Sequence, residues 1–248
     1  MATFAAAVAG DAHALDSGAP LATLAESAIK ATWLADAHST GGPAQRRRAL
    51  WEAVGIQLDD LSSTVLALNL VASEGSYLSR FTEPARDCGE PLVLTLRQLA
   101  RQPLEFVARP VFVCENPAVV AVAADQLGAS CPPLICVNGQ PSSAALRLLA
   151  ALHHNGARML YHGDFDWGGL RIANLLRSRM PWVPWRFDTA AYLGAVSRAR
   201  RPLRGRPTEA GWDDKLASAI SERNLAVDEE LVIEDLVTDL RSAANSVG

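Results

Sequence analysis

The chain has 248 residues, of which 49% are hydrophobic and 20% are charged, and its formal net charge at pH 7 is −4. This composition is ordinary for a soluble globular protein, and the length suits one large or two ordinary domains. The net charge of −4 excludes a polycation. Because no apolar run is long enough to span a membrane, we expect a cytoplasmic protein without a membrane partner.

The charge is distributed unevenly along the chain. Residues 158–206 contain ten arginines and three acids, a local charge of +7, whereas residues 228–239 contain six acids and no base. Basic density beside an acidic pocket is what an enzyme that acts on nucleic acid needs, because arginines bind phosphate. A solvated, arginine-rich surface is an equally good interpretation.

The four cysteines show no metal-binding or disulfide pattern. They are Cys88, Cys114, Cys131 and Cys136, with no Cys-x-x-Cys pair and no histidine at zinc-ligand spacing. Cys114 and Cys136 lie in apolar runs and are expected to be core thiols, as in a cytosolic protein.

Residues 1–108 are predicted to be mainly helical. Leu21, Leu24 and Ala25 begin a helical repeat of apolar residues, and Arg46-Arg-Arg48 opens a second helix. The apolar stretch 61–71 fits either a strand or a helix. Residues 91–96 predict a strand that leads into a short helix.

From Pro110 onward, strands and helices alternate. Strands are predicted at 111–115, 134–137, 158–161 and 185–187, and helices at 118–127, 143–154, 170–180, 212–221 and 229–244. Ser142 is expected to cap one of these helices and Asn155-Gly156 to end it. The connections are too long for hairpins, which predicts an α/β domain at 109–190 with a mostly parallel sheet flanked by helices. Residues 191–248 are predicted to form an arginine-rich loop and a C-terminal helical extension.

Three acids follow predicted strands of this sheet. Asp164 and Asp166 are two residues apart on extended backbone, so they point to the same side, and Glu115 ends an earlier strand. In open α/β sheets, ligands gather at the carboxyl ends of the strands, so the three converge if these strands are parallel neighbours. Three carboxylates repel one another unless a cation neutralises them, and oxygen-only ligation suits Mg²⁺ or Mn²⁺. We therefore predict that Glu115, Asp164 and Asp166 are metal ligands and catalytic residues.

The residues that follow the acids favour an anion. Gly168 and Gly169 leave backbone N–H groups open at the start of a helix, which suits a phosphate. Arg171 could bind a phosphate through two hydrogen bonds, the alternative being a surface ion pair. Further contacts to DNA phosphates are predicted for Arg198, Arg200, Arg201 and Arg204.

Three other polar residues have structural explanations. His162 is expected to be a satisfied structural histidine rather than a proton shuttle. Glu229 and Glu230 are expected to start a helix in solvent rather than to supply an outer metal ligand.

The order of elements and the placing of the acids resemble the Toprim fold of type IA and II topoisomerases, primases and old-family nucleases. In that fold a Glu follows the first strand and an Asp-x-Asp the third, which match Glu115 and Asp164-Phe-Asp166. The stretch Gly163–Gly169, followed by Arg171-Ile172, resembles the corresponding motif in the A subunit of topoisomerase VI. More narrowly, the chain resembles the Toprim nuclease subunit of the Wadjet-type, SMC-containing plasmid-defence operons of bacteria, through stretches at 11–16, 59–64, 91–96, 209–213 and 228–230.

The resemblance implies Mg²⁺-dependent hydrolysis of double-stranded DNA, guided by an SMC-type motor complex, with a homodimer as one assembly open to the chain. It also implies that residues 1–108 could be a truncated DNA-binding or partner-binding domain. Two alternatives stay open. One is topoisomerase-like strand breakage by a tyrosine, for which Tyr77 is the only positional candidate. The other is a non-catalytic subunit that binds DNA or a nucleotide.

Overall fold

A computed structural model describes residues 1–33, 47, 50–51, 54, 56, 60–101 and 103–245. The chain forms two compact units, Met1–Ser62 and Ser63–Gly248. Among the described residues, no helix combines the length and the apolarity that crossing a membrane requires.

The first unit has two described helices, α1 (Ala2–Ala9) and α2 (Pro20–Trp33). Its small core includes Ala5, Ile29 and Trp51. Of the three consecutive arginines only Arg47 is described, and its guanidinium donates to the Glu26 carboxylate at 2.6 Å. The predicted helix at residues 21–29 is confirmed. Arg46 and Arg48 lie outside the described residues.

The second unit is built on a six-stranded sheet in the order β2-β1-β4-β3-β5-β6. The strands are β1 (Thr64–Leu68), β2 (Leu92–Thr95), β3 (Val111–Cys114), β4 (Leu134–Cys136), β5 (Met159–Tyr161) and β6 (Val183–Pro184). Strands β3 to β6 pair in parallel, whereas β1 is antiparallel to both β2 and β4. The mixed α/β class with a mostly parallel sheet is therefore confirmed.

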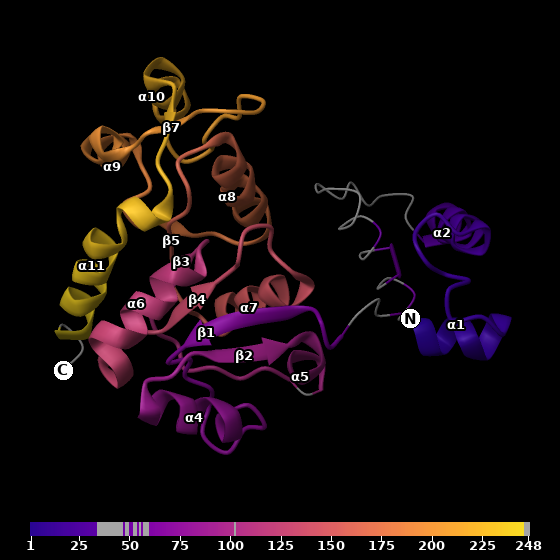
Figure 1. Cartoon of the computed structure of the whole chain (residues 1–248). Helices are drawn as coiled ribbons and strands as arrows, with labels where there is room; N and C mark the ends of the chain where they lie inside the picture. Colours follow the sequence, from indigo (N-terminus) through magenta and orange to yellow (C-terminus); the bar gives the residue numbers. More distant parts are fainter. Residues whose placement is uncertain are drawn as a thin grey trace. The chain divides into compact units, whose positions relative to one another are not determined.

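Eight described helices accompany this sheet, and some of them cover its two faces. They are α4 (Ser79–Cys88), α5 (Leu96–Ala100), α6 (Pro117–Leu127), α7 (Ser143–His154), α8 (Trp167–Arg179), α9 (Thr189–Ala195), α10 (Leu216–Arg223) and α11 (Ile233–Asn245). Figure 1 shows α6 and α11 on one side of the sheet and α7 and α8 on the other. This follows from right-handed crossovers, because the chain moves one way along the sheet through α6 and the opposite way through α7 and α8. Every residue of β3 and β4 is buried, as expected for strands covered on both faces.

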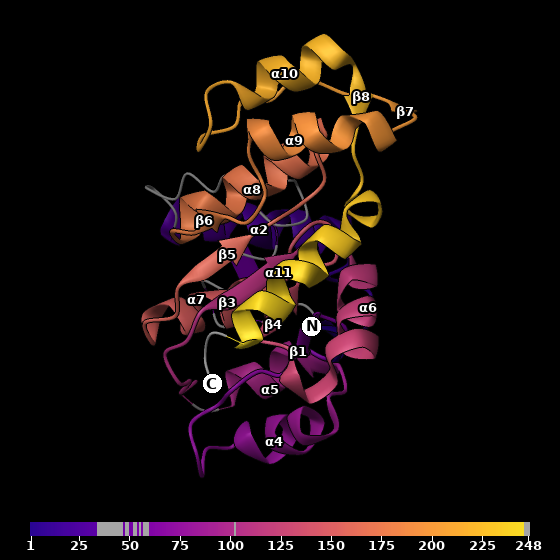
Figure 2. The ribbon, with the colours of Figure 1, turned by 90° about the vertical axis from the view of Figure 1, so that its left-hand side faces the viewer.

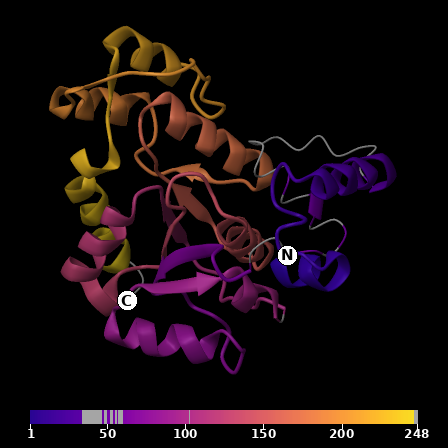
Figure 3. The same ribbon diagram turned by 45° about the vertical axis from the view of Figure 1, so that its right-hand side comes forward.

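The C-terminal part of the unit adds smaller elements to this core. The short strands β7 (Arg201–Pro202) and β8 (Leu225–Ala226) pair antiparallel, and α10 lies between them in the sequence. Helices α9 and α10 pack on each other beyond the end of the sheet (Figure 3). Figure 2 shows α11 running beside α6, onto which it packs.

Several predicted boundaries are confirmed with their caps. Helix α7 spans the predicted range, and the Ser142 hydroxyl accepts from the Ala145 N–H at 3.0 Å. The apolar stretch 61–71 contains a strand rather than a helix, and residues 92–100 form the predicted strand and short helix. Cys114 and Cys136 are fully buried thiols, and all four cysteines are free.

Three expectations differ from the structure. The predicted domain boundary after residue 108 is instead a division after Ser62, because β1 and β2 complete the same sheet as β3 to β6. The predicted strand at 185–187 is wrong: β6 ends at Pro184, and Arg186 has φ 48°, which an extended strand does not accommodate. The predicted helix at 229–244 is divided into a 3-10 turn, η3 (Glu229–Leu231), and α11.

Gly89 offers a test of how α4 is held in the second unit. It ends α4 with φ 70°, and a Cβ atom there would lie 2.4 Å from the backbone nitrogen of Ala129. We expect Gly89→Ala to lower the free energy of unfolding by about 2–5 kcal/mol, through left-handed strain and a backbone clash. Urea denaturation measures the change.

The matched control is Gly75→Ala, because Gly75 has φ 75° but open space around its Cβ position. We expect it to lose only the strain, about 1–2 kcal/mol. Equal losses in the two variants would contradict the packing of α4 against residues 128–130.

Candidate functional site

The three predicted acids lie at one edge of the sheet. Strands β3 and β5 are parallel neighbours, with Val113 opposite Tyr161, so Glu115 and Asp164 leave the sheet on the same side. The Glu115 Oε2 atom lies 3.4 Å from the backbone nitrogen of Asp164. The convergence of Glu115 and Asp164 that the sequence predicted is therefore present in the structure.

Each aspartate has protein partners of its own. One oxygen of Asp164, Oδ1, accepts from the Glu229 N–H at 2.8 Å. Asp166 is the N-cap of α8, and its Oδ1 accepts from the N–H groups of Gly168 at 2.7 Å and Gly169 at 2.9 Å. Its other oxygen, Oδ2, accepts from Arg201 at 2.9 Å.

Close packing leaves little room for a side chain at Gly163 or Gly169. A Cβ on Gly169 would lie 2.0 Å from the Asp164 carbonyl oxygen, and a Cβ on Gly163 would lie 3.0 Å from Glu115 Oε2. The N–H groups of Gly168 and Gly169 donate to Asp166, so they are not open to an anion in this arrangement. This corrects the expectation that the glycine pair leaves them free.

Burial and mutual repulsion raise the pKa values of two of the acids. Burial, reinforced by the nearby Asp164 carboxylate, raises the pKa of Glu115 to about 8. Burial, with repulsion from Asp166 and Asp228, raises the pKa of Asp164 to about 6, although the hydrogen bond from Glu229 opposes the shift. The charged forms of these two acids are therefore disfavoured without a cation, and a bound cation would stabilise them.

Glu229 holds the site together, and the sequence did not identify it. Its side chain is fully buried, and its carboxylate accepts from the backbone N–H of Glu115, at 3.1 and 3.0 Å, and from that of Asn116. Burial raises its pKa well above the usual range. The expectation of a solvated helix start is wrong for Glu229. Its neighbour Glu230 is exposed, and its carboxylate accepts from the Asn116 side chain at 2.6 Å. No local pattern distinguishes the two residues, because both belong to one acidic run.

The Tyr161 hydroxyl is another buried group near the acids. Tyr161 lies in β5, and its ring packs against Trp182 and Phe187. A Cβ on Gly163 would lie 2.8 Å from the hydroxyl oxygen, which has no hydrogen-bond partner among the described residues. Burial raises the pKa of Tyr161 well above its usual range, so the hydroxyl stays protonated.

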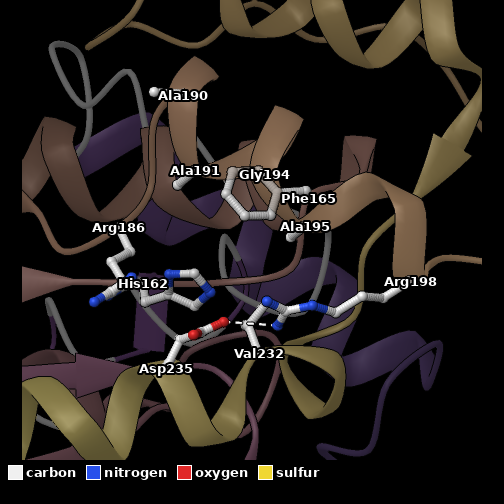
Figure 4. Close-up of a pocket in the computed structure, with 10 residues that line it drawn as sticks. All are labelled: His162, Phe165, Arg186, Ala190, Ala191, Gly194, Ala195, Arg198, Val232 and Asp235. Carbon is white, nitrogen blue, oxygen red and sulfur yellow. Dashed lines mark hydrogen bonds and ion pairs between the residues drawn. The ribbon is translucent and has the colours of Figure 1, made fainter.

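His162 has a structural contact and one unpaired nitrogen. Its Nδ1 lies 2.9 Å from the Trp185 carbonyl oxygen, and burial lowers its pKa to about 4. Its Nε2 has no partner among the described residues, so the histidine is structural but only half satisfied. It lines a cavity of about 220 Å³ with Arg186, Arg198 and Asp235 (Figure 4).

The acidic segment 228–239 neutralises part of the basic region. Arg198 pairs with Asp235 at 2.6 Å, Arg186 pairs with Asp239, and Arg201 bridges Asp228 and Asp166. The positive charge that the sequence concentrates in residues 158–206 is therefore partly compensated in space.

The remaining arginines predicted to bind phosphate differ in their contacts. Arg200 donates to the carbonyls of Ser197 and Ala199, and Arg171 donates to the Arg206 carbonyl and the Thr208 hydroxyl. Arg204 is exposed, and no polar contact involves its side chain in the part of the chain that the structure describes. Arg171 thus supports the loop near Thr208 rather than forming an ion pair.

The three acids supply suitable ligand atoms for a divalent cation, but their side chains are not already arranged around an ion. Within the described ranges, no three or more His, Cys, Asp or Glu side chains are arranged to hold a metal ion. The carboxylates of Glu115, Asp164 and Asp166 are nevertheless the oxygen donors that Mg²⁺ prefers, crowded at one edge. Arg201 occupies Asp166 Oδ2, so ligation by all three acids requires this ion pair to open.

Two family models match the chain. Residues 92–240, which include all three acids, match the model described as "Protein of unknown function C-terminus (DUF2399)". Residues 1–72 match the model described as "Protein of unknown function N-terminus (DUF3323)". No curated protein matches the chain.

The role of Glu229 is tested by removing its carboxylate. Glu229→Ala leaves the N–H groups of Glu115 and Asn116 buried without acceptors. We expect a loss of about 2–5 kcal/mol in the free energy of unfolding, since each unpaired buried donor costs about 1–3 kcal/mol. Chemical denaturation measures it, with Glu230→Ala as control, for which we expect less than about 1 kcal/mol. Similar stabilities of the two variants would rule out this role.

Proposed function

Because the chain belongs to the DUF2399 family, whose description names no activity, we propose from the site itself that it is a divalent-metal-dependent DNA endonuclease subunit. The observation that carries the proposal is the meeting of Glu115 and Asp164 at the carboxyl edge of adjacent parallel strands, with Asp166 two residues further on. Ligands gather at this edge in open α/β sheets.

Glu115, Asp164 and Asp166 are the residues that would hold Mg²⁺ or Mn²⁺. Bound there, the ion would polarise a phosphodiester and activate water for hydrolysis. Glu115 is placed to move a proton at Oε2, the oxygen that lies near the Asp164 backbone. Arg201, which bridges Asp166 and Asp228, is placed to bind a DNA phosphate once a cation takes over Asp166.

The finer assignment rests on the resemblance. We propose that the sheet with its acids is of the Toprim type, and that the chain is the nuclease subunit of a Wadjet-type plasmid-defence complex in the cytoplasm. The proposed partners are double-stranded DNA and an SMC-type motor complex, and a second copy of the chain is compatible with this role. The sequence contains no Walker-type phosphate-binding loop, which agrees with a motor that is supplied by a partner protein.

We propose hydrolysis rather than attack by a tyrosine. Tyr161 is buried with a raised pKa, and the Tyr192 hydroxyl donates to the Leu225 carbonyl. Tyr77 contacts the Phe81 ring, and the Arg101 guanidinium lies 6.0 Å from its centroid. Water activated beside the acids needs none of these phenols.

The proposal is tested with supercoiled plasmid DNA, with and without the motor partners. We expect cleavage with Mg²⁺ or Mn²⁺, none with EDTA, and loss of cleavage in Glu115→Gln. Glu222→Gln, a charge-matched change at an exposed residue of α10, and Tyr77→Phe should retain cleavage. The same ions should raise the melting temperature of the isolated chain by linkage, and Asp164→Asn with Asp166→Asn should abolish the rise.

The outcomes separate the alternatives. Labelled DNA that stays attached to the denatured protein would establish covalent attack and overturn hydrolysis. A chain that neither cleaves DNA nor responds to either ion would support the non-catalytic subunit.

DNA binding by the segment 196–206 is tested through its salt dependence. Arg200→Gln with Arg204→Gln removes two exposed arginines that form no ion pair among the described residues. We expect the slope of log affinity against log salt to fall by about 1.8, at about 0.9 for each phosphate contact. Fluorescence anisotropy with duplex DNA measures it.

A matched pair of substitutions is Arg179→Gln with Arg223→Gln, two exposed arginines at the ends of α8 and α10. Equal slopes in both double variants would mean that Arg200 and Arg204 are solvated surface. Arg198 and Arg201 are left intact in this test, because both form ion pairs with acids.

A further inference from the structure

A second cavity lies at the opposite edge of the sheet from the acids. Arg109 and Arg158 precede the parallel strands β3 and β5, whereas Glu115 and Asp164 follow them, so the two sets leave opposite edges. The cavity has a volume of about 560 Å³, within the range of about 300–1,000 Å³ typical of small-molecule sites.

Positive charge lines this cavity with little compensation. Arg86, Arg109 and Arg158 line it, and no acidic residue is among its lining residues. Arg109 and Arg158 are exposed and form no ion pair in the described part of the chain, and Arg86 approaches only its neighbour Asp87, at 3.7 Å. Three guanidinium groups from separate segments suit a ligand that carries more than one negative charge.

The walls of the cavity are apolar. Phe112 of β3 and Leu160 of β5 are register partners in the sheet, so their side chains lie side by side. Phe112 is supported by an edge contact with Trp185, with ring centroids 4.8 Å apart. Ala244, near the end of α11, contributes a small side chain to the lining. These surfaces suit a flat apolar body rather than a solvated anion.

Asn69 adds a specific polar group. It is 5% exposed, and its Nδ2 donates to the carbonyls of Gly128 and Cys131, both at 2.8 Å. Its Oδ1 is buried without a partner among the described residues, although Asn69 lines the cavity. Buried acceptors are rarely left unpaired, so this oxygen fits a ligand that offers an N–H group.

We propose that this cavity binds a nucleoside phosphate. Its base packs on Phe112 and Leu160 and donates an N–H to Asn69 Oδ1, and its phosphates pair with Arg86, Arg109 and Arg158. A simple carboxylate carries one charge, and inorganic phosphate has no apolar body, so neither uses the whole site. The proposal is independent of the nuclease assignment, because it involves the other edge of the sheet.

The test uses the full chain in EDTA with ADP, GDP, CDP and UDP, followed by thermal shift and calorimetry. We expect at least one nucleotide to raise the melting temperature and to bind more tightly than pyrophosphate or the free nucleoside. Arg109→Gln with Arg158→Gln should weaken that binding about tenfold or more. Arg179→Gln, a control at the exposed end of α8, should leave the affinity unchanged.

A second variant tests nucleotide binding separately from any loss of folding in the arginine variant. Ala244→Trp fills the cavity from α11 without removing a charge, and we expect it to lose nucleotide binding while keeping the ligand-free melting temperature. Asp164→Asn with Asp166→Asn should bind the nucleotide as the unaltered chain does.

Four results would overturn the proposal. The first is no binding of any of the four nucleotides, and the second is binding of pyrophosphate as tight as that of the nucleotides. The third is nucleotide affinity that is unchanged in Arg109→Gln with Arg158→Gln. The fourth is loss of nucleotide binding in Asp164→Asn with Asp166→Asn. If duplex DNA binding alone fell in the arginine variant, these residues would belong to a DNA surface instead.

Discussion

The buried carboxylate of Glu229 is the contact on which the arrangement of the candidate site depends. It accepts from the backbone N–H groups of Glu115 and Asn116 where β3 ends, while its own N–H donates to Asp164 after β5. One residue from the C-terminal part of the chain thus fixes the ends of two neighbouring strands. The cost is a buried acid beside two others, and burial with like charge raises the pKa values of Glu115, Asp164 and Glu229 alike.

That concentration of acids is balanced by arginines from the preceding segment. Arg201 bridges Asp166 and Asp228, and Arg198 pairs with Asp235. The basic and acidic segments of the sequence are therefore partly paired with each other. Exposed arginines outside these ion pairs, including Arg204, carry the charge that would contact DNA in the function that we propose. Because Arg201 holds Asp166, cation binding and phosphate binding are coupled at one side chain in the function that we propose.

The two edges of the sheet differ in charge and in polarity. The carboxyl edge of β3 and β5 carries the acids, and the amino edge carries Arg109 and Arg158 beside the apolar surface of Phe112 and Leu160. Parallel strands make such a separation possible, because residues before and after each strand gather at opposite edges. The cation site and the nucleotide site that we propose are then kept apart by the length of the strands.

The sequence by itself determined the alternation of strands and helices, the cap of α7 by Ser142, and the placing of Glu115 and Asp164 after two strands, because these follow from local hydrophobic patterns and turn residues. That these two strands are parallel neighbours was decided by the tertiary structure. Only the tertiary structure decided that β1 and β2 join the same sheet and that Glu229 is buried, since both depend on contacts between residues far apart in the chain. The same holds for the glycine pair: Gly168 and Gly169 resemble a phosphate loop locally, but their N–H groups donate to Asp166, and the Gly169 position is filled by the Asp164 carbonyl. The sequence places positive charge in one segment and negative charge in another. Only folding brings the two together, because the ion pairs join side chains that lie 27 to 53 residues apart in the sequence.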